Sequence, residues 1–141
     1  MKRIIAIALF VAATLIPASS ALAQDHRVGA TVPFSFTVNG NTLPAGTYRI
    51  GSDVTQANML SIRSRQNKVN IWTMGLAESG NPGTGKLVFH RYGDSYFLSE
   101  ICYPNSSARV HFPVSKMEKR TRAHTLEAGL NVNSNVLIAL N

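Results

Sequence analysis

The sequence of 141 residues contains a single cysteine, Cys102. A disulfide within the chain is therefore excluded, and so are the cysteine clusters that bind zinc or iron–sulfur groups. The four histidines, at positions 26, 90, 111 and 124, include no closely spaced pair from which a metal site could be built. We predict no metal and no other cofactor. The Cys102 thiol is expected to be buried in a strand, with pairing to a second chain as the alternative.

Acidic residues are scarce, and the motifs of common hydrolases are missing. Seven Asp and Glu residues stand singly along the chain, there is no G-x-S-x-G turn, and Cys102 lacks the flanking residues of known cysteine proteases. We therefore predict that the protein is not an enzyme. The alternative, a small secreted hydrolase, needs a nucleophile beside a histidine and an acid. Its candidate residues are Ser95, Ser99, Cys102, His90, His111, Asp94 and Glu100.

Residues 80–86, GNPGTGK, match the G-x-x-x-x-G-K pattern of a phosphate-binding loop. Such a loop needs Ser or Thr at the next position to hold Mg²⁺, and a helix whose N–H groups face the phosphates. Here Leu87 follows and begins a predicted strand. We therefore predict a glycine-rich loop between strands rather than a nucleotide site.

The N-terminus has the layout of a secretory signal peptide. Lys2 and Arg3 are followed by an apolar run over residues 4–16 and by the small-x-small sequence Ala21-Leu22-Ala23. The apolar run is shorter than the ~20 residues that span a bilayer. We predict a signal peptide over residues 1–23 and one β domain over 24–141. The mature protein is expected to be periplasmic or secreted, with no membrane span after cleavage.

The predicted mature chain remains basic. Twelve of the 14 Lys and Arg residues follow residue 23, together with all seven Asp and Glu, which leaves a net charge of +5. The densest basic stretch consists of Lys116, Lys119, Arg120 and Arg122. This stretch is a candidate for docking on an anionic envelope component or another protein. The interpretation that we favour for the run itself is the solvated face of a surface helix. Nucleic acid is not an expected partner, because an exported protein is separated from the nucleic acids of the cell. In addition, no base-stacking motif flanks the basic run.

An apolar, aromatic stretch over residues 86–103 predicts a central β-hairpin. Gly93-Asp94 supplies a two-residue turn, which pairs Tyr92 with Ser95 and His90 with Phe97. Directly paired residues share a face of a sheet. One face is then expected to carry Leu87, Phe89, Tyr96 and Leu98, and the other Val88, His90, Tyr92, Phe97 and Ile101. Glu100 is expected on the face opposite His90, and both faces are expected to be covered.

Shorter strands are predicted around this hairpin. After a mobile lead over residues 24–30, alternating apolar residues predict a strand over 31–38, and Asn39-Gly40 predicts a tight turn. Further strands are predicted near residues 48–50, 60–62, 69–76, 109–114 and 136–140, with a polar connection at 53–58, a polar turn at 64–68 and a flexible loop at 78–85.

One helix is predicted near the C-terminus. Ser115 and Glu118 fit a capping box, and Gly129 is suited to end the helix in a left-handed conformation. The apolar stripe of this helix is thin and consists of Met117, Thr121, His124 and Ala128, so the helix should lie on the surface. The predicted fold class is therefore all-β with one short C-terminal helix, as a single antiparallel β-sandwich or small β-barrel of seven to eight strands.

The opening FSFTVNGNTLPAGTYRI, together with FHRYGDSYFLSEI and SKMEK further on, resembles a group of small exported bacterial β proteins. These proteins share an F-x-V-x-G-x-x-L-P-A-G-x-Y-type opening and have no assigned function. The resemblance covers most of the mature chain and implies a small β fold. It brings no activity and no site residues.

We predict an exported, non-catalytic binding or structural module of the bacterial envelope or extracellular space. Aromatic residues on a β face that could stack on sugars are Trp72, Tyr48, Tyr92 and Tyr103, although packing in a core explains each of them equally well. An alternative function is a β-barrel carrier, with an apolar ligand enclosed by Phe34, Phe36 and Trp72. The sequence leaves the ligand and the oligomeric state open.

Overall fold

The computed structural model describes residues 27–52, 56, 58–130 and 132–141. The predicted signal peptide over residues 1–23 and most of the predicted connection at 53–58 lie outside the described residues. The strands are β1 (Arg27–Val32), β2 (Phe36–Val38), β3 (Asn41–Leu43), β4 (Gly46–Ser52), β5 (Met59–Ser64), β6 (Val69–Met74), β7 (Leu76–Ser79), β8 (Lys86–Tyr92), β9 (Ser95–Cys102), β10 (Ala108–His111) and β11 (Val132–Ala139), and the helix is α1 (Lys116–Glu127).

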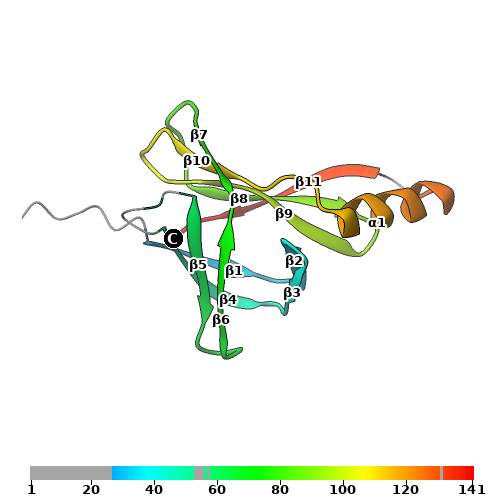
Figure 1. Ribbon diagram of the computed structural model, residues 1–141, viewed down its shortest axis with the longest axis horizontal. Helices are drawn as coiled ribbons and strands as arrows, with labels where there is room; N and C mark the ends of the chain where they lie inside the picture. The colour runs from blue at the N-terminus through cyan, green and yellow to red at the C-terminus, as the bar shows by residue number, and fades with distance from the viewer. Residues whose placement is uncertain (1–26, 53–55, 57, 131) are drawn as a thin grey trace, which may run out of the picture.

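The strands form two sheets. A four-stranded sheet has the order β1-β4-β5-β6, and a seven-stranded sheet has the path β11-β8-β9-β10-β7, with β2 joined to β9 and β3 joined to β2. Figure 1 shows the two sheets facing each other, with α1 projecting at the end away from the C-terminus. This mostly β, two-sheet arrangement is consistent with a sandwich and confirms the predicted fold class.

The chain crosses between the sheets at two points where the sequence predicted continuous strands. The strand expected over residues 31–38 is divided at Pro33, which cannot donate to a sheet, so that β1 and β2 lie in different sheets. The strand expected over 69–76 is divided at Gly75, where an added Cβ would lie 2.3 Å from Val110. Together with β3, for which no strand was predicted, the two divisions give the described part of the chain eleven strands instead of seven to eight.

Two segments expected to be irregular are strands in the structure. Residues 27–30, expected to belong to a mobile lead, form most of β1 and pair with β4. Residues 78 and 79, expected to open a flexible loop, belong to β7 and pair with β10. In both cases the partner strand is far away in the sequence, so the pairing had no local signal.

The central hairpin has the predicted turn register, with Tyr92 opposite Ser95 and His90 opposite Phe97. A β-bulge then adds one residue, Ser99, to β9, because Phe89 pairs with Leu98 whereas Val88 pairs with Glu100. Beyond the bulge the faces are therefore exchanged relative to the prediction. Ile101 pairs with Leu87 in the core, and Glu100 lies on the same face as His90.

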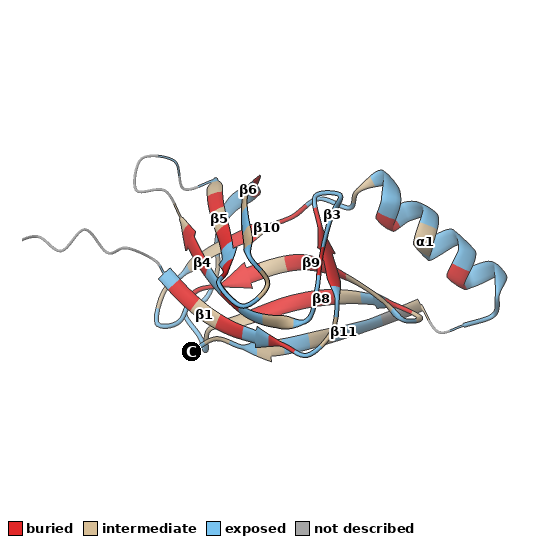
Figure 2. Cartoon of the chain, turned by 90° about the horizontal axis from the view of Figure 1, so that it is seen from below, coloured by how far each residue is buried: buried red, intermediate tan, exposed pale blue. Residues whose placement is uncertain are grey.

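Aromatic rings form the centre of the core between the sheets. Phe89 and Tyr48 are fully buried, and Phe36 makes edge-to-face contacts with both, at centroid distances of 5.3 Å. Phe34 contacts Phe89 at 5.2 Å and stacks on Tyr96 at 3.9 Å. Figure 2 shows the buried positions along β8 and β9 and the exposed surface of α1. This packing fixes the sheets and therefore the side chains on their outer faces.

Helix α1 begins and ends as predicted. The Ser115 hydroxyl accepts a hydrogen bond from the Glu118 N–H at 3.1 Å, and Gly129 follows the helix with φ of +69°. The expected apolar stripe is wrong, because Met117 and His124 are exposed and the buried helix residues are Glu118 and Thr125. The helix is held on the surface mainly by polar contacts.

Candidate functional site

Two parallel rows of side chains cross the outer face of the four-stranded sheet. The strand register places Arg27, Gly51, Ser61 and Trp72 in one row, and Gly29, Arg49, Arg63 and Asn70 in the next. In the first row Gly51 and Ser61 have little or no side chain, whereas Arg27 and Trp72 at the ends are large. The row is therefore low in the middle and high at both ends.

This arrangement produces a hollow of about 680 Å³, which we call the arginine groove. Its lining residues are Arg27, Thr47, Arg49, Ile50, Gly51, Ser52, Ser61, Arg63, Arg65, Gln66 and Trp72. Trp72 is 53% exposed. Gly51 keeps the floor open, because a Cβ at this position would lie 3.3 Å from the Ser61 hydroxyl and 3.4 Å from the Arg27 side chain.

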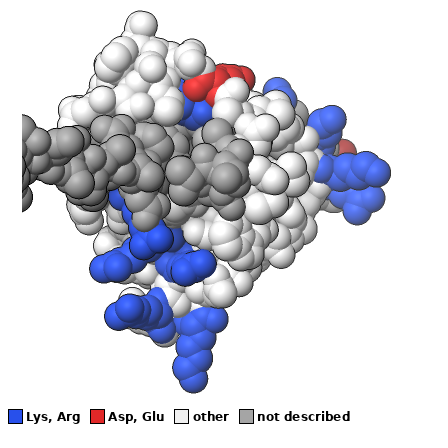
Figure 3. Space-filling view, turned by 60° about the vertical axis from the view of Figure 1, so that its left-hand side comes forward, with Lys and Arg blue, Asp and Glu red and all other residues white. Residues whose placement is uncertain are grey.

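The arginine groove is strongly positive. Four of its described lining residues are arginine and none is acidic. Arg49 and Arg63 are direct cross-strand partners, an arrangement of like charges that destabilises a sheet. Figure 3 shows one group of basic side chains in the lower part of the view, with no acidic side chain visible among them.

Arg63 also connects the charged part of the groove to its aromatic end. Its guanidinium carbon lies 5.8 Å from the centroid of the Trp72 ring, within the range of a cation–π contact. About half of the Trp72 surface nevertheless remains exposed, and so ring and cation are both accessible from the groove. The site can bind an anion and a flat apolar surface at neighbouring positions.

The groove arginines were not identified as a site from the sequence. They come from β1, β4, β5 and the turn after β5, and none of them belongs to a dense basic run. A signal was present, since Arg49 is an outward position of one predicted strand and Arg63 directly follows the next predicted strand along the chain. Pairing these strands as a hairpin would have placed the two arginines together.

The predicted docking residues Lys116, Lys119, Arg120 and Arg122 all lie on α1 and all are exposed. None of them lines the arginine groove. Figure 1 places α1 at the end of the molecule away from the C-terminus, whereas Arg27 and Arg49 lie on β1 and β4. The described part of the chain therefore presents two separate basic surfaces.

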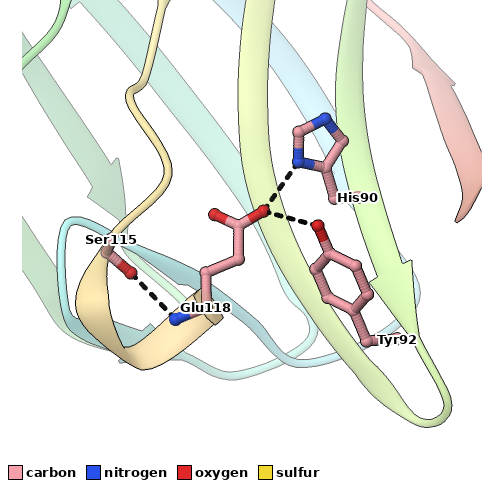
Figure 4. Close-up of polar contacts among 4 residues, drawn as sticks. All are labelled: His90, Tyr92, Ser115 and Glu118. Carbon is pink, nitrogen blue, oxygen red and sulfur yellow. Dashed lines mark hydrogen bonds and ion pairs between the residues drawn. The ribbon is translucent and has the colours of Figure 1, made fainter. Parts of the chain in front are cut away.

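A buried polar cluster holds α1 against the seven-stranded sheet. One carboxylate oxygen of Glu118, Oε1, lies 2.7 Å from His90 Nδ1 and accepts a hydrogen bond from the Tyr92 hydroxyl at 3.0 Å (Figure 4). Glu118 is only 4% exposed. Burial, together with the Glu118 hydrogen bond and charge, raises the pKa of Tyr92 to about 12. His90 thus contacts an acid from the helix, not the Asp94 or Glu100 considered in the sequence.

Glu100 belongs to a second cluster on the same sheet. It accepts a hydrogen bond from Arg109 at 3.1 Å and another from the Cys102 thiol at 3.4 Å. Lys86, Arg109 and Cys102 also line a small pocket of about 200 Å³ beside the glycine-rich loop. Burial raises the pKa of the Cys102 thiol, and the hydrogen bond to Glu100 raises it further.

We expect Cys102 to react slowly with thiol reagents in the folded protein. The thiol is 8% exposed and its pKa is raised, so little thiolate is present and access is poor. The rate with Ellman's reagent near neutral pH should be about 100-fold lower than in the urea-unfolded chain. Equal rates before and after unfolding would contradict a buried, protonated thiol.

The remaining candidate residues do not converge on one site. His90 and Glu118 meet the hydrogen-bonding requirement of the hydrolase alternative, but neither lines either of the hollows described above. Phe34 and Phe36 pack in the core, whereas Trp72 lies on an outer face, so these three residues do not enclose a common cavity. Within residues 27–52, 56, 58–130 and 132–141, no three His, Cys, Asp or Glu residues are grouped to hold a metal ion.

The described residues include no helix that is both long and apolar enough to cross a membrane. Comparison with known proteins found no family model, no curated protein and no solved structure that matches this chain. The resemblance noted from the sequence therefore stays a prediction.

Proposed function

We propose that this protein is an exported, non-catalytic binding module that attaches to an anionic component of the bacterial envelope or extracellular space through the arginine groove. The observation that carries the proposal is the gathering of Arg49, Arg63 and Arg65 in one hollow whose described lining includes no acidic residue. Arginine guanidinium groups bind carboxylate, sulfate and phosphate groups through paired hydrogen bonds.

The opposed pair Arg49 and Arg63 supports a binding role. Direct opposition of like charges lowers the stability of the sheet, and Arg49 has no acidic partner among the described residues. An anion bound between the two guanidinium groups would replace this repulsion by attraction. The groove therefore gains more from an anionic ligand than an evenly charged surface would.

The test compares two variants that remove the same charge from different surfaces. Arg49→Ser with Arg63→Ser empties the groove of two cations, and Lys119→Ser with Arg120→Ser removes two from α1. The probe is fluorescent dextran sulfate at physiological ionic strength, and the protein is purified after expression of the full chain. Its intact mass also reports whether residues 1–23 have been removed.

We expect the groove variant to bind dextran sulfate about 100-fold more weakly, since each charged hydrogen bond contributes about 1.5 kcal/mol. The helix variant should stay within about threefold of wild type, as long-range charge alone is screened by salt. The groove variant should stay within about 0.5 kcal/mol of the wild-type stability, because removal of the like-charge pair offsets the loss of the contact between Arg63 and Trp72. If the helix variant loses binding instead, the α1 surface is the docking site; if neither does, the proposal fails.

A further inference from the structure

The arginine groove offers three kinds of contact within one hollow. Arginines supply charged donors, Trp72 supplies an exposed aromatic face, and Thr47, Ser52, Ser61 and Gln66 supply neutral hydrogen-bonding groups. A ligand that uses all three must carry anionic groups, hydroxyl groups and a ring with an apolar face. This combination restricts the chemistry of the ligand more than charge does, and it rests on the proposed function of the groove.

Simple polyanions use only part of this lining. Polyphosphate has no hydrogen-bond donors and no apolar face, so it would leave Trp72 and the Gln66 carbonyl without a contact. Lipid headgroups form a broad surface, whereas the groove cations surround a floor lowered by Gly51 and Ser61. A narrow polymer that enters the hollow fits this shape better than a bilayer does.

Single-stranded nucleic acid also carries charge, hydroxyl groups and rings. Proteins that bind it usually stack successive bases on several aromatic side chains. The arginine groove has one aromatic residue among its described lining, and Tyr48, beneath the same sheet, is buried in the core. One stacking position beside several arginines suits a chain in which most of the affinity comes from acidic groups.

We propose that the arginine groove binds an acidic polysaccharide, with one sugar ring stacked on Trp72 and carboxylate groups paired with Arg63 and Arg49. The C–H groups of a sugar ring carry partial positive charge and face the negative surface of the indole ring. The cation–π contact holds the Arg63 guanidinium 5.8 Å from the same ring. A carboxylate attached to the stacked sugar therefore lies within reach of this guanidinium.

Trp72 is the only tryptophan of the chain, so its fluorescence reports directly on the groove. The test titrates wild-type protein with oligogalacturonate, with the neutral maltooligosaccharide of equal length, with polyphosphate and with an oligothymidylate. We expect oligogalacturonate to change the Trp72 emission in a saturable way at low salt. The neutral sugar should bind at least about tenfold more weakly, because it lacks the charged contacts.

Variants at Trp72 separate stacking from charge. Trp72→Ala should weaken oligogalacturonate binding about tenfold, measured by calorimetry, and Trp72→Phe should restore part of this loss because it keeps an aromatic face. Polyphosphate binding should be unchanged in both variants. The matched control is Met74→Ala, which removes another exposed side chain from β6 outside the groove lining and should have no effect.

The outcomes distinguish this inference from the proposed function. If oligogalacturonate and polyphosphate bind equally and Trp72→Ala changes neither, the groove is a general anion site and the polysaccharide inference is overturned. If oligothymidylate binds more tightly and depends on Trp72, the ligand is nucleic acid and the inference is likewise overturned. If no anion depends on Arg49 and Arg63, the proposed function fails as well.

Discussion

Replacing Glu118 with Ala is expected to release α1 from the sheet. The carboxylate is 4% exposed and contacts both the His90 ring and the Tyr92 hydroxyl, and Tyr92 is itself 5% exposed. Removing it leaves a buried hydroxyl and a partly buried ring without their acceptor, which costs about 3 kcal/mol. Few other buried contacts hold the helix, because Thr125 is its only other buried residue.

The loss of about 3 kcal/mol should appear first as local opening of α1. Amide hydrogen exchange across Lys116–Glu127 should accelerate about 100-fold, while exchange in β8 and β9 changes little. The matched control is Glu127→Ala on the same helix, whose side chain is 77% exposed. Glu118→Gln keeps an acceptor for Tyr92 and should fall between the two. Equal acceleration in the two Ala variants would contradict the prediction that the buried carboxylate holds α1.

Replacing Phe89 with Ala should cause the largest loss of global stability. Phe89 is 0% exposed and contacts Phe34 and Phe36 edge-to-face, so it joins β8 to the segment that crosses between the sheets. Truncating a buried Phe to Ala lowers the free energy of unfolding by about 3–5 kcal/mol. A domain of this size has about 5–15 kcal/mol in total, so the variant should be close to unfolding at ambient temperature.

Urea denaturation followed by circular dichroism measures this loss. The control is Leu137→Ala on the neighbouring strand β11, where the side chain is 57% exposed and the change should stay within about 0.5 kcal/mol. A loss below about 1 kcal/mol for Phe89→Ala would contradict its central place in the core. Binding to the arginine groove should persist in any folded fraction, because Phe89 does not line the groove.

The central hairpin shows which features of a strand pair can be predicted from neighbouring residues alone. The turn at Gly93-Asp94 needs only neighbouring residues, and its register was predicted correctly. The bulge at Ser99 was missed, and with it the faces of Glu100 and Ile101. The position of a bulge depends on how the two strands pack against their neighbours in the sheet. The residue at the bulge, Ser99, is not of a type that predicts one.

Helix α1 shows the same division between local and distant interactions. Ser115 and Gly129 are local signals for its two ends, and both predictions were confirmed. The contacts of Glu118 were predicted only in part. Its N–H donates a hydrogen bond to Ser115 as the capping box predicts, whereas its carboxylate contacts His90 and Tyr92. Those two residues lie on a strand more than 20 positions earlier, and so spacing along the helix does not reveal them.

The sequence by itself determined the class of this protein, because alternating apolar residues, tight turns and a helix cap act over a few neighbouring positions. Only the tertiary structure decided where the candidate site lies. Arg27, Arg49, Arg63 and Trp72 belong to four strands, and their meeting depends on the order and register in which those strands pair. Strand order is set by burial of the whole core rather than by any one segment, which is why the dense basic run on α1 was visible in the sequence and the arginine groove was not.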